Sequence, residues 1–156
     1  MNIQIIAVGQ KMPKWVDEAY HEYAKRLPRQ QAIILTCIAT ANRNSGQPVE
    51  RLQAQEAEKI RSKIKADSLT IALDEHGQQW STQQWAEQYR RWQHEYPQVN
   101  FIIGGPDGIA PELLKAADQT LALGRMTLPH GLARVVLIEQ LYRAWSVVEG
   151  HPYHRE

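Results

Sequence analysis

Short apolar runs, rich in β-branched residues, alternate along the chain with longer amphipathic segments. The apolar runs predict strands over residues 2–9, 33–38, 69–73 and 99–103, with a fifth stretch at 121–123. The amphipathic segments predict helices over residues 13–27, 49–64, 81–95 and 132–148, with a short one near Pro111. Strands alternating with helices are typical of a mostly parallel sheet covered by helices on both faces. We therefore predict one α/β domain over residues 1–156.

Local signals mark several of these boundaries. Pro13 begins the first helix and Pro28 ends it. Ser81, with Gln84 three residues later, has the pattern of a capping box at a helix start. Residues 39–48 are polar and rich in turn formers, so we expect a mobile loop there.

Composition narrows the class of protein. The 156 residues are 43% hydrophobic and 22% charged, which are values of a globular protein. A net charge of +1 argues against a protein that finds nucleic acid by bulk charge, although residues 1–65 hold 11 Lys and Arg against 6 Asp and Glu. The single cysteine, Cys37, excludes an intrachain disulfide. With no signal-peptide pattern and no apolar run near 20 residues, we expect a cytoplasmic protein that contacts no membrane.

Two loops could bind a ligand. Gly104 and Gly105 directly follow an apolar strand, where they allow close approach of another backbone or of a ligand. The turn lacks the spacing of a phosphate-binding loop, and a plain tight turn explains it equally well. The second loop precedes the last helix, and Leu123, Met126 and Leu128 offer apolar walls beside the Thr127 hydroxyl. This mixture suits a flat heteroaromatic ligand, although a loop packed under the sheet would show the same pattern.

The last helix is apolar around most of its circumference. Most of its polar residues occupy one stripe about 120° wide: Glu139, Gln140, Arg143 and Ser146. Such a helix needs cover beyond its sheet side, and a second subunit is the simplest cover. Arg134 lies opposite that stripe, among apolar residues, so its guanidinium needs a partner. It is either an anchor for backbone carbonyls or a group directed across an interface or at substrate.

The C-terminal residues form a compact set of chemical groups, although chain ends normally fray. His151, Tyr153, His154 and Arg155 offer proton transfer, stacking and anion binding within five residues. No third ligand stands beside the two histidines, so we expect no metal site.

Several separate motifs carry a resemblance to a known family. They are the opening Ile6-Ala-Val-Gly-x-Lys-Met-Pro13, Ile102-Ile-Gly-Gly-Pro-Asp-Gly108, Thr127-Leu-Pro-His130, the segment 133–144 and the C-terminus 151–156. In this order and at this length, the chain resembles the RlmH family of ribosomal RNA large subunit methyltransferases, in the SPOUT superfamily. The resemblance implies a SPOUT-type domain with a C-terminal trefoil knot, a homodimer, and S-adenosyl-L-methionine as cofactor. The implied reaction is methylation of N3 of a pseudouridine in 23S rRNA, on the assembled ribosome and without a metal.

The resemblance also implies which residues contact the cofactor. By position these are Leu73, Gly104, Gly105, Leu123, Gly124, Arg125, Met126, Thr127 and Leu128.

The implied chemistry needs a base, because the imide N3 of pseudouridine is a weak nucleophile while it is protonated. The available catalytic groups are His130, Arg143, Tyr153, His154 and Arg155. We expect His154 to be the base, Arg155 or Arg143 to stabilise the imide oxygens or a phosphate, and Tyr153 to stack on the uracil ring. The alternative is that residues 151–153 only dock the C-terminus onto the cofactor loop.

Two other functions fit the same sequence. One is a non-catalytic nucleotide-binding module in ribosome assembly, and the other is an S-adenosylmethionine-dependent tRNA methyltransferase. A near-neutral chain leaves little electrostatic attraction for free RNA, so we expect recognition to depend on the assembled ribosome.

Overall fold

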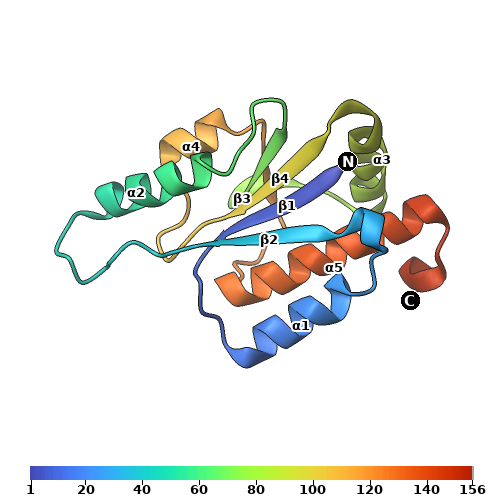
Figure 1. The fold of residues 1–156 in the computed structure, drawn as a ribbon, viewed down its shortest axis with the longest axis horizontal. Coiled ribbons are helices and arrows are strands. Elements are labelled where there is room, and N and C mark those ends of the chain that lie inside the picture. Colours follow the sequence, from blue (N-terminus) through green and yellow to red (C-terminus); the bar gives the residue numbers. More distant parts are fainter. Residues whose placement is uncertain (156) are drawn as a thin grey trace.

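In the computed structural model, which describes residues 1–155, a five-stranded sheet lies between two layers of helices (Figure 1). The strands are β1 (Asn2–Val8), β2 (Ile33–Ile38), β3 (Leu69–Gln79), β4 (Gln98–Ile103) and β5 (Gln119–Ala122). Their order is β2-β1-β4-β3-β5, and every neighbouring pair is parallel. The predicted parallel sheet is confirmed. Strand order alone does not define a knot, so the trefoil knot stays a prediction.

Helices cover both faces of this sheet, as predicted. They are α1 (Lys14–Ala24), α2 (Val49–Arg61), α3 (Thr82–Glu95), α4 (Pro111–Ala116) and α5 (His130–Glu149), with short 3-10 turns η1 (Arg29–Gln31) and η2 (Pro152–Arg155). Helices α1, α3 and α5 pack on one face, and α2 and α4 on the other (Figure 1). Along β1, Ile5 faces the first layer and Ile6 the second, because successive side chains point to opposite faces. No helix within residues 1–155 is long and apolar enough to cross a membrane.

Several bounds differ from the sequence prediction: α2 ends at Arg61 and not at residue 64, and β5 spans Gln119–Ala122 and not 121–123. Two further differences have clear reasons. β3 continues six residues past its predicted end at Leu73, to Gln79, and pairs there with β5 after a register shift between Leu73 and Gln78. These added residues have no apolar alternation, so the pattern did not predict them, and the strand is completed where Gln78 and Gln79 pair with β5. α1 ends at Ala24 and not at Leu27, because the chain tightens into a turn in which Leu27 N–H donates to Ala24 O at 3.3 Å.

The chain reverses direction at the end of α5. Gly150 adopts a left-handed conformation with φ 71°, which glycine reaches without steric cost. His151 N–H then donates to Ser146 O at 2.8 Å, and η2 packs back against α5. Residues 151–155, which we call the tail, are therefore ordered against the helix.

Candidate functional site

A cavity of about 840 Å³ lies at the carboxyl ends of the parallel strands. This size is ordinary for a small-molecule site, and this edge of an open α/β sheet is where ligands usually bind. Five segments line it: residues 8–12, Thr40, 73–75, 103–109, and residues from 121 to 133. Parallel pairing thus brings together loops that are far apart in the sequence.

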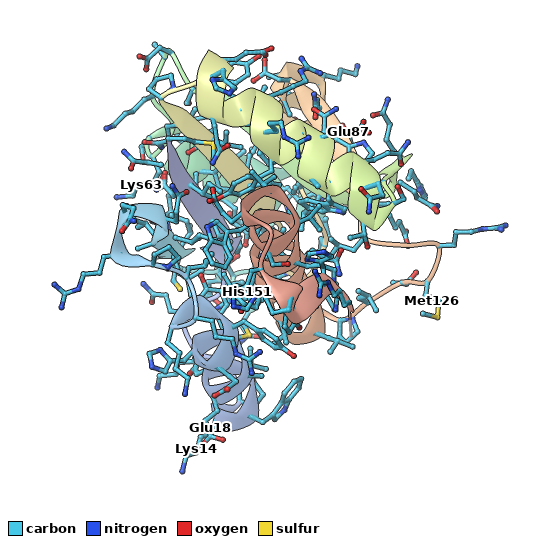
Figure 2. All side chains as sticks on the ribbon, turned by 90° about the vertical axis from the view of Figure 1, so that its right-hand side faces the viewer. Lys14, Glu18, Lys63, Glu87, Met126 and His151 are labelled. Carbon is cyan, nitrogen blue, oxygen red and sulfur yellow. The ribbon has the colours of Figure 1, made fainter. Side chains whose placement is uncertain are left out.

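Most of the residues expected to contact a cofactor line this cavity. They are Leu73, Gly104, Gly105, Leu123, Gly124, Met126, Thr127 and Leu128. Arg125 is exposed and is not among the lining residues. Met126 is 78% exposed and stands away from the body of the molecule on its loop (Figure 2). The structure therefore gathers this group of residues around one space, with Arg125 outside it.

The two adjacent glycines are required by packing of the chain. A Cβ on Gly104 would lie 2.7 Å from the backbone of Gly108. A Cβ on Gly105 would lie 2.9 Å from the Val8 side chain and 3.1 Å from a carboxylate oxygen of Glu56. The sequence offered two explanations for the glycine pair: close approach of another part of the protein or close approach of a ligand. These distances show that contacts within the protein already require both glycines.

Two acidic residues on the cavity wall were missed by the sequence analysis. Asp74 and Glu75 line the cavity directly after Leu73. Glu75 Oε2 accepts a hydrogen bond from Thr127 Oγ1 at 2.7 Å, which ties the loop before α5 to β3. The available signal was their position after an apolar strand, the same signal that identified the glycine turn.

His130, the first residue of α5, has both ring nitrogens engaged within the chain. Nδ1 lies 2.8 Å from Gly104 O, and Nε2 lies 2.9 Å from Nη2 of Arg134. A guanidinium can only donate, so Nε2 accepts and Nδ1 donates, which describes a neutral imidazole. Burial lowers the pKa of His130, and the nearby charge of Arg134 lowers it further, against the opposing effect of the Gly104 bond. These contacts make His130 a support for the glycine turn.

Arg134 is 1% exposed and connects the same helix to a second strand end. Its Nη2 also donates to Gly9 O at 3.1 Å, and Gly9 directly follows β1. Arg134 Nε has no hydrogen-bond partner among the described residues. Of the two roles considered for Arg134, an anchor for a backbone carbonyl matches these contacts.

The tail is held to α5 through Glu139. Tyr153 Oη donates to Glu139 Oε1 at 2.9 Å, and its ring centroid lies 4.6 Å from that of Tyr142. Arg143 donates to the same Glu139 oxygen at 2.9 and 2.6 Å and lies over the Tyr153 ring at 5.0 Å. Burial, and then the bond to Glu139, raise the pKa of Tyr153. Arg143 and Tyr153 are therefore engaged in docking the tail onto α5.

His154 has one ring nitrogen in contact with the helix. Its Nδ1 lies 3.4 Å from Ser146 Oγ, a weak contact, while the Ser146 hydroxyl donates to Arg143 O at 2.7 Å. Ser146 must then accept from Nδ1–H, which leaves the Nε2 lone pair of His154 without a role in this contact. Arg155, at the end of η2, is exposed.

Within one chain, the tail and the cavity lie apart. Ser146 follows His130 by sixteen positions on one continuous helix, a rise of about 24 Å. The tail lies at the far end of α5 from His130 (Figure 1). The structure thus places His130 at the cavity but keeps the other predicted catalytic residues away from it: Arg143, Tyr153, His154 and Arg155. Residues 1–155 contain no group of three or more His, Cys, Asp or Glu side chains placed to hold a metal ion.

Comparison with known proteins agrees with this architecture. A family model described as "predicted SPOUT methyltransferase" matches residues 1–154. A Pseudomonas fluorescens protein named ribosomal RNA large subunit methyltransferase H is 46% identical over 99% of this chain and 100% of its own length. Proteins of the same name from Pseudomonas putida and Ectopseudomonas mendocina are 45% and 44% identical, with the same coverage. The chain therefore belongs to the SPOUT methyltransferase family, as its motifs indicated.

Proposed function

We propose that this protein transfers a methyl group from S-adenosyl-L-methionine to N3 of a pseudouridine in 23S rRNA, on the assembled ribosome in the cytoplasm. One observation carries the proposal: in a member of a methyltransferase family, the loops at residues 73–75, 103–109 and 123–130 converge on one cavity. The names of the similar proteins supply the class of substrate, large-subunit ribosomal RNA.

The residues around the cavity fit this cofactor. Leu73, Leu123 and Leu128 provide apolar surface for a flat ring, and the loop backbone provides polar groups for its edge. The carboxylates of Asp74 and Glu75 suit ribose hydroxyls and a positively charged sulfonium. When bound, S-adenosylmethionine supplies an electrophilic methyl group.

The protein's own task is to orient the imide and accept its proton. His154 is our choice of base, because its Nε2 is left free to accept the N3 proton. The exposed guanidinium of Arg155 suits the imide oxygens or a neighbouring phosphate. The contacts of Arg143 and Tyr153 with Glu139 favour a role in holding the tail over direct contact with the base.

The same geometry supports a homodimer. His154 contacts Ser146, about 24 Å along α5 from His130 at its own cavity, so the proposed base can serve chemistry only at the cavity of a second copy. α5 offers a surface for that copy, because several of its apolar side chains are only partly buried: Val135, Val136, Trp145, Val147 and Val148. Leu132 at its start and Trp15 on α1 are 36% and 53% exposed. Pairing through α5 would cover these groups.

Methyl transfer from labelled S-adenosylmethionine tests the proposal. The purified protein is incubated separately with whole ribosomes, free subunits, deproteinised 23S rRNA and tRNA, and the labelled nucleoside is identified by mass spectrometry. We expect N3-methylpseudouridine from whole ribosomes and little label in naked rRNA. Label in tRNA would instead establish a tRNA methyltransferase, and ribosome binding without transfer a non-catalytic assembly module.

A further inference from the structure

An ion-pair network, buried at its Glu56 carboxylate and partly exposed at Arg43 and Asp107, joins α2 to the loop 39–48 and to the glycine turn. Glu56 on α2 is only 2% exposed. Its Oε2 accepts from Ala41 N–H at 2.9 Å and from Arg43 Nη1 at 2.7 Å. Arg43 Nε in turn donates to Asp107 Oδ2 at 3.0 Å. We call Arg43, Glu56 and Asp107 the brace.

The brace holds a segment that its sequence predicts to be mobile. Arg43 Nη1 also donates to Ala41 O at 2.9 Å, so the guanidinium holds the backbone of its own loop at Ala41. A second tie from α2 reaches the glycine turn, because Gln53 Nε2 donates to Asp107 O at 2.7 Å. Asp107 is therefore fixed through both its side chain and its backbone.

One side of the brace forms part of the cavity wall. Asp107 and Gly105 line the cavity, whereas Arg43 and Glu56 do not. Glu56 Oε1 packs against Gly105 so closely that an added Cβ there would lie 3.1 Å from it. Glu56 thus supports the base of the turn, while Arg43 holds Asp107 within it.

The burial of Glu56 is not needed to attach α2 to the sheet. Leu52, Ala57 and Ile60 are 3%, 1% and 2% exposed and already bury the inner side of the helix. A buried carboxylate carries a desolvation cost that is offset only by a close cation and further hydrogen bonds. The partners that offset it here are the loop 39–48 and, through Arg43, the glycine turn.

We propose that Arg43 and Glu56 are positioning residues for the cofactor, holding the Gly104–Gly108 turn in its binding shape. This inference rests on the proposed function. A turn with three glycines has wide conformational freedom, and any freedom lost on binding weakens affinity. The brace removes that freedom before the ligand arrives.

Calorimetric titration with S-adenosylhomocysteine, the demethylated cofactor, tests this role. Arg43→Ala should weaken binding by about tenfold, within the range for substitutions that act on a site without touching it. KM for S-adenosylmethionine should rise while kcat at saturation stays near the wild-type value, because the reacting groups are untouched. Arg51→Ala is the matched control, since Arg51 is an exposed arginine of α2 for which the described residues show no hydrogen bond or ion pair to the turn. Its affinity should equal that of the wild type.

A second variant separates positioning from loss of fold and from direct contact. Asp107→Ala leaves the Arg43–Glu56 pair intact, so the buried carboxylate of Glu56 keeps its cation. The affinity of this variant can therefore be measured even if Arg43→Ala is unstable. In a double-mutant cycle, Arg43→Ala and Asp107→Ala should be strongly non-additive if Asp107 acts through Arg43. Additive losses would mean that Asp107 contacts the ligand itself, and would overturn the inference. Wild-type affinity in either folded single variant would also overturn the inference. If the wild-type protein itself binds no S-adenosylhomocysteine, the proposed function is overturned as well.

Discussion

At the scale of single residues, His130 and Arg134 connect two strand ends through the first turn of one helix. Arg134 donates to Gly9 O and to His130 Nε2, and His130 Nδ1 donates to Gly104 O. This chain of contacts requires a neutral imidazole, because a protonated ring would place two donors face to face. His130, one of the catalytic candidates in the sequence, is better described as a support for the cavity.

The neutral state of His130 predicts a pH dependence of stability. Its pKa is lowered in the folded protein, so the unfolded chain takes up this proton at higher pH than the folded chain. The free energy of unfolding that depends on His130 is therefore fully present above about pH 6.5, the ordinary pKa of histidine, and decreases as the pH falls below it. Urea unfolding between pH 5 and 8 measures this effect.

The variant His130→Gln provides the comparison. It lacks the titrating ring, so the stability difference between wild type and variant should narrow as the solution is acidified. The five other histidines are common to both proteins and cancel in the difference. Parallel stability curves across this range would contradict the assignment of a neutral, hydrogen-bonded His130.

At the scale of elements, α5 carries the cavity at its start and the tail at its end. The tail depends on the αL turn at Gly150 and on the bond from Tyr153 to Glu139. In the function that we propose, the cofactor binds at the cavity, whereas the base that we assign lies in the tail. Binding and catalysis should therefore be separable by truncation.

Deleting residues 151–156 should abolish methylation and leave binding of S-adenosylhomocysteine within a few-fold of the wild type. Loss of a general base typically lowers the rate by about 100-fold or more. Tyr153→Phe, which removes only the hydroxyl bond to Glu139, should give a smaller loss. Methylation at the wild-type rate by the truncated protein would exclude the tail from the chemistry.

The sequence pattern correctly predicts those elements whose structure depends on interactions between residues close together in the chain. The strand Ile33–Ile38 and the capping box at Ser81 were predicted with the bounds and contacts observed. The extension of β3 was not, because residues 74–79 have no apolar alternation, and the strand is completed where Gln78 and Gln79 pair with β5. The ion pair between Arg43 and Asp107 spans 64 positions, and no periodicity reports a contact of that separation. The cavity residues came from family motifs, but the distance between tail and cavity required the path of α5 in space.

At the scale of the whole molecule, the proposed base and the cavity lie near opposite ends of α5 in one protomer. The distance along α5 predicts complementation between two inactive variants of a homodimer. One variant lacks the tail, and the other is Gly124→Trp, which adds a bulky ring at a residue that lines the cavity and should obstruct binding there. A Cβ on Gly124 meets nothing within 4 Å, so this substitution should not disturb the fold.

Mixing the two variants under conditions of subunit exchange should restore activity. In the mixed dimer, the intact cavity of the truncated chain receives the tail of its partner. With free exchange at equal concentrations, about half of the dimers should be mixed, and one of the two sites in each mixed dimer should be functional. Activity should therefore reach about a quarter of that of the same amount of wild-type protein. No recovery despite demonstrated exchange would show that tail and cavity act within the same chain.

The arrangement of the sheet also affects how the chain folds during its synthesis. β1 lies between β2 and β4, and Asn2 pairs with Gln98, which is added to the chain 96 residues later. At ordinary rates of translation this interval lasts about 5 to 20 s. Throughout it, the mainly apolar segment Ile3 to Val8 has at most one of its two neighbouring strands available, because β2 is made well before β4. The nascent chain therefore exposes an aggregation-prone segment until most of its length has been made.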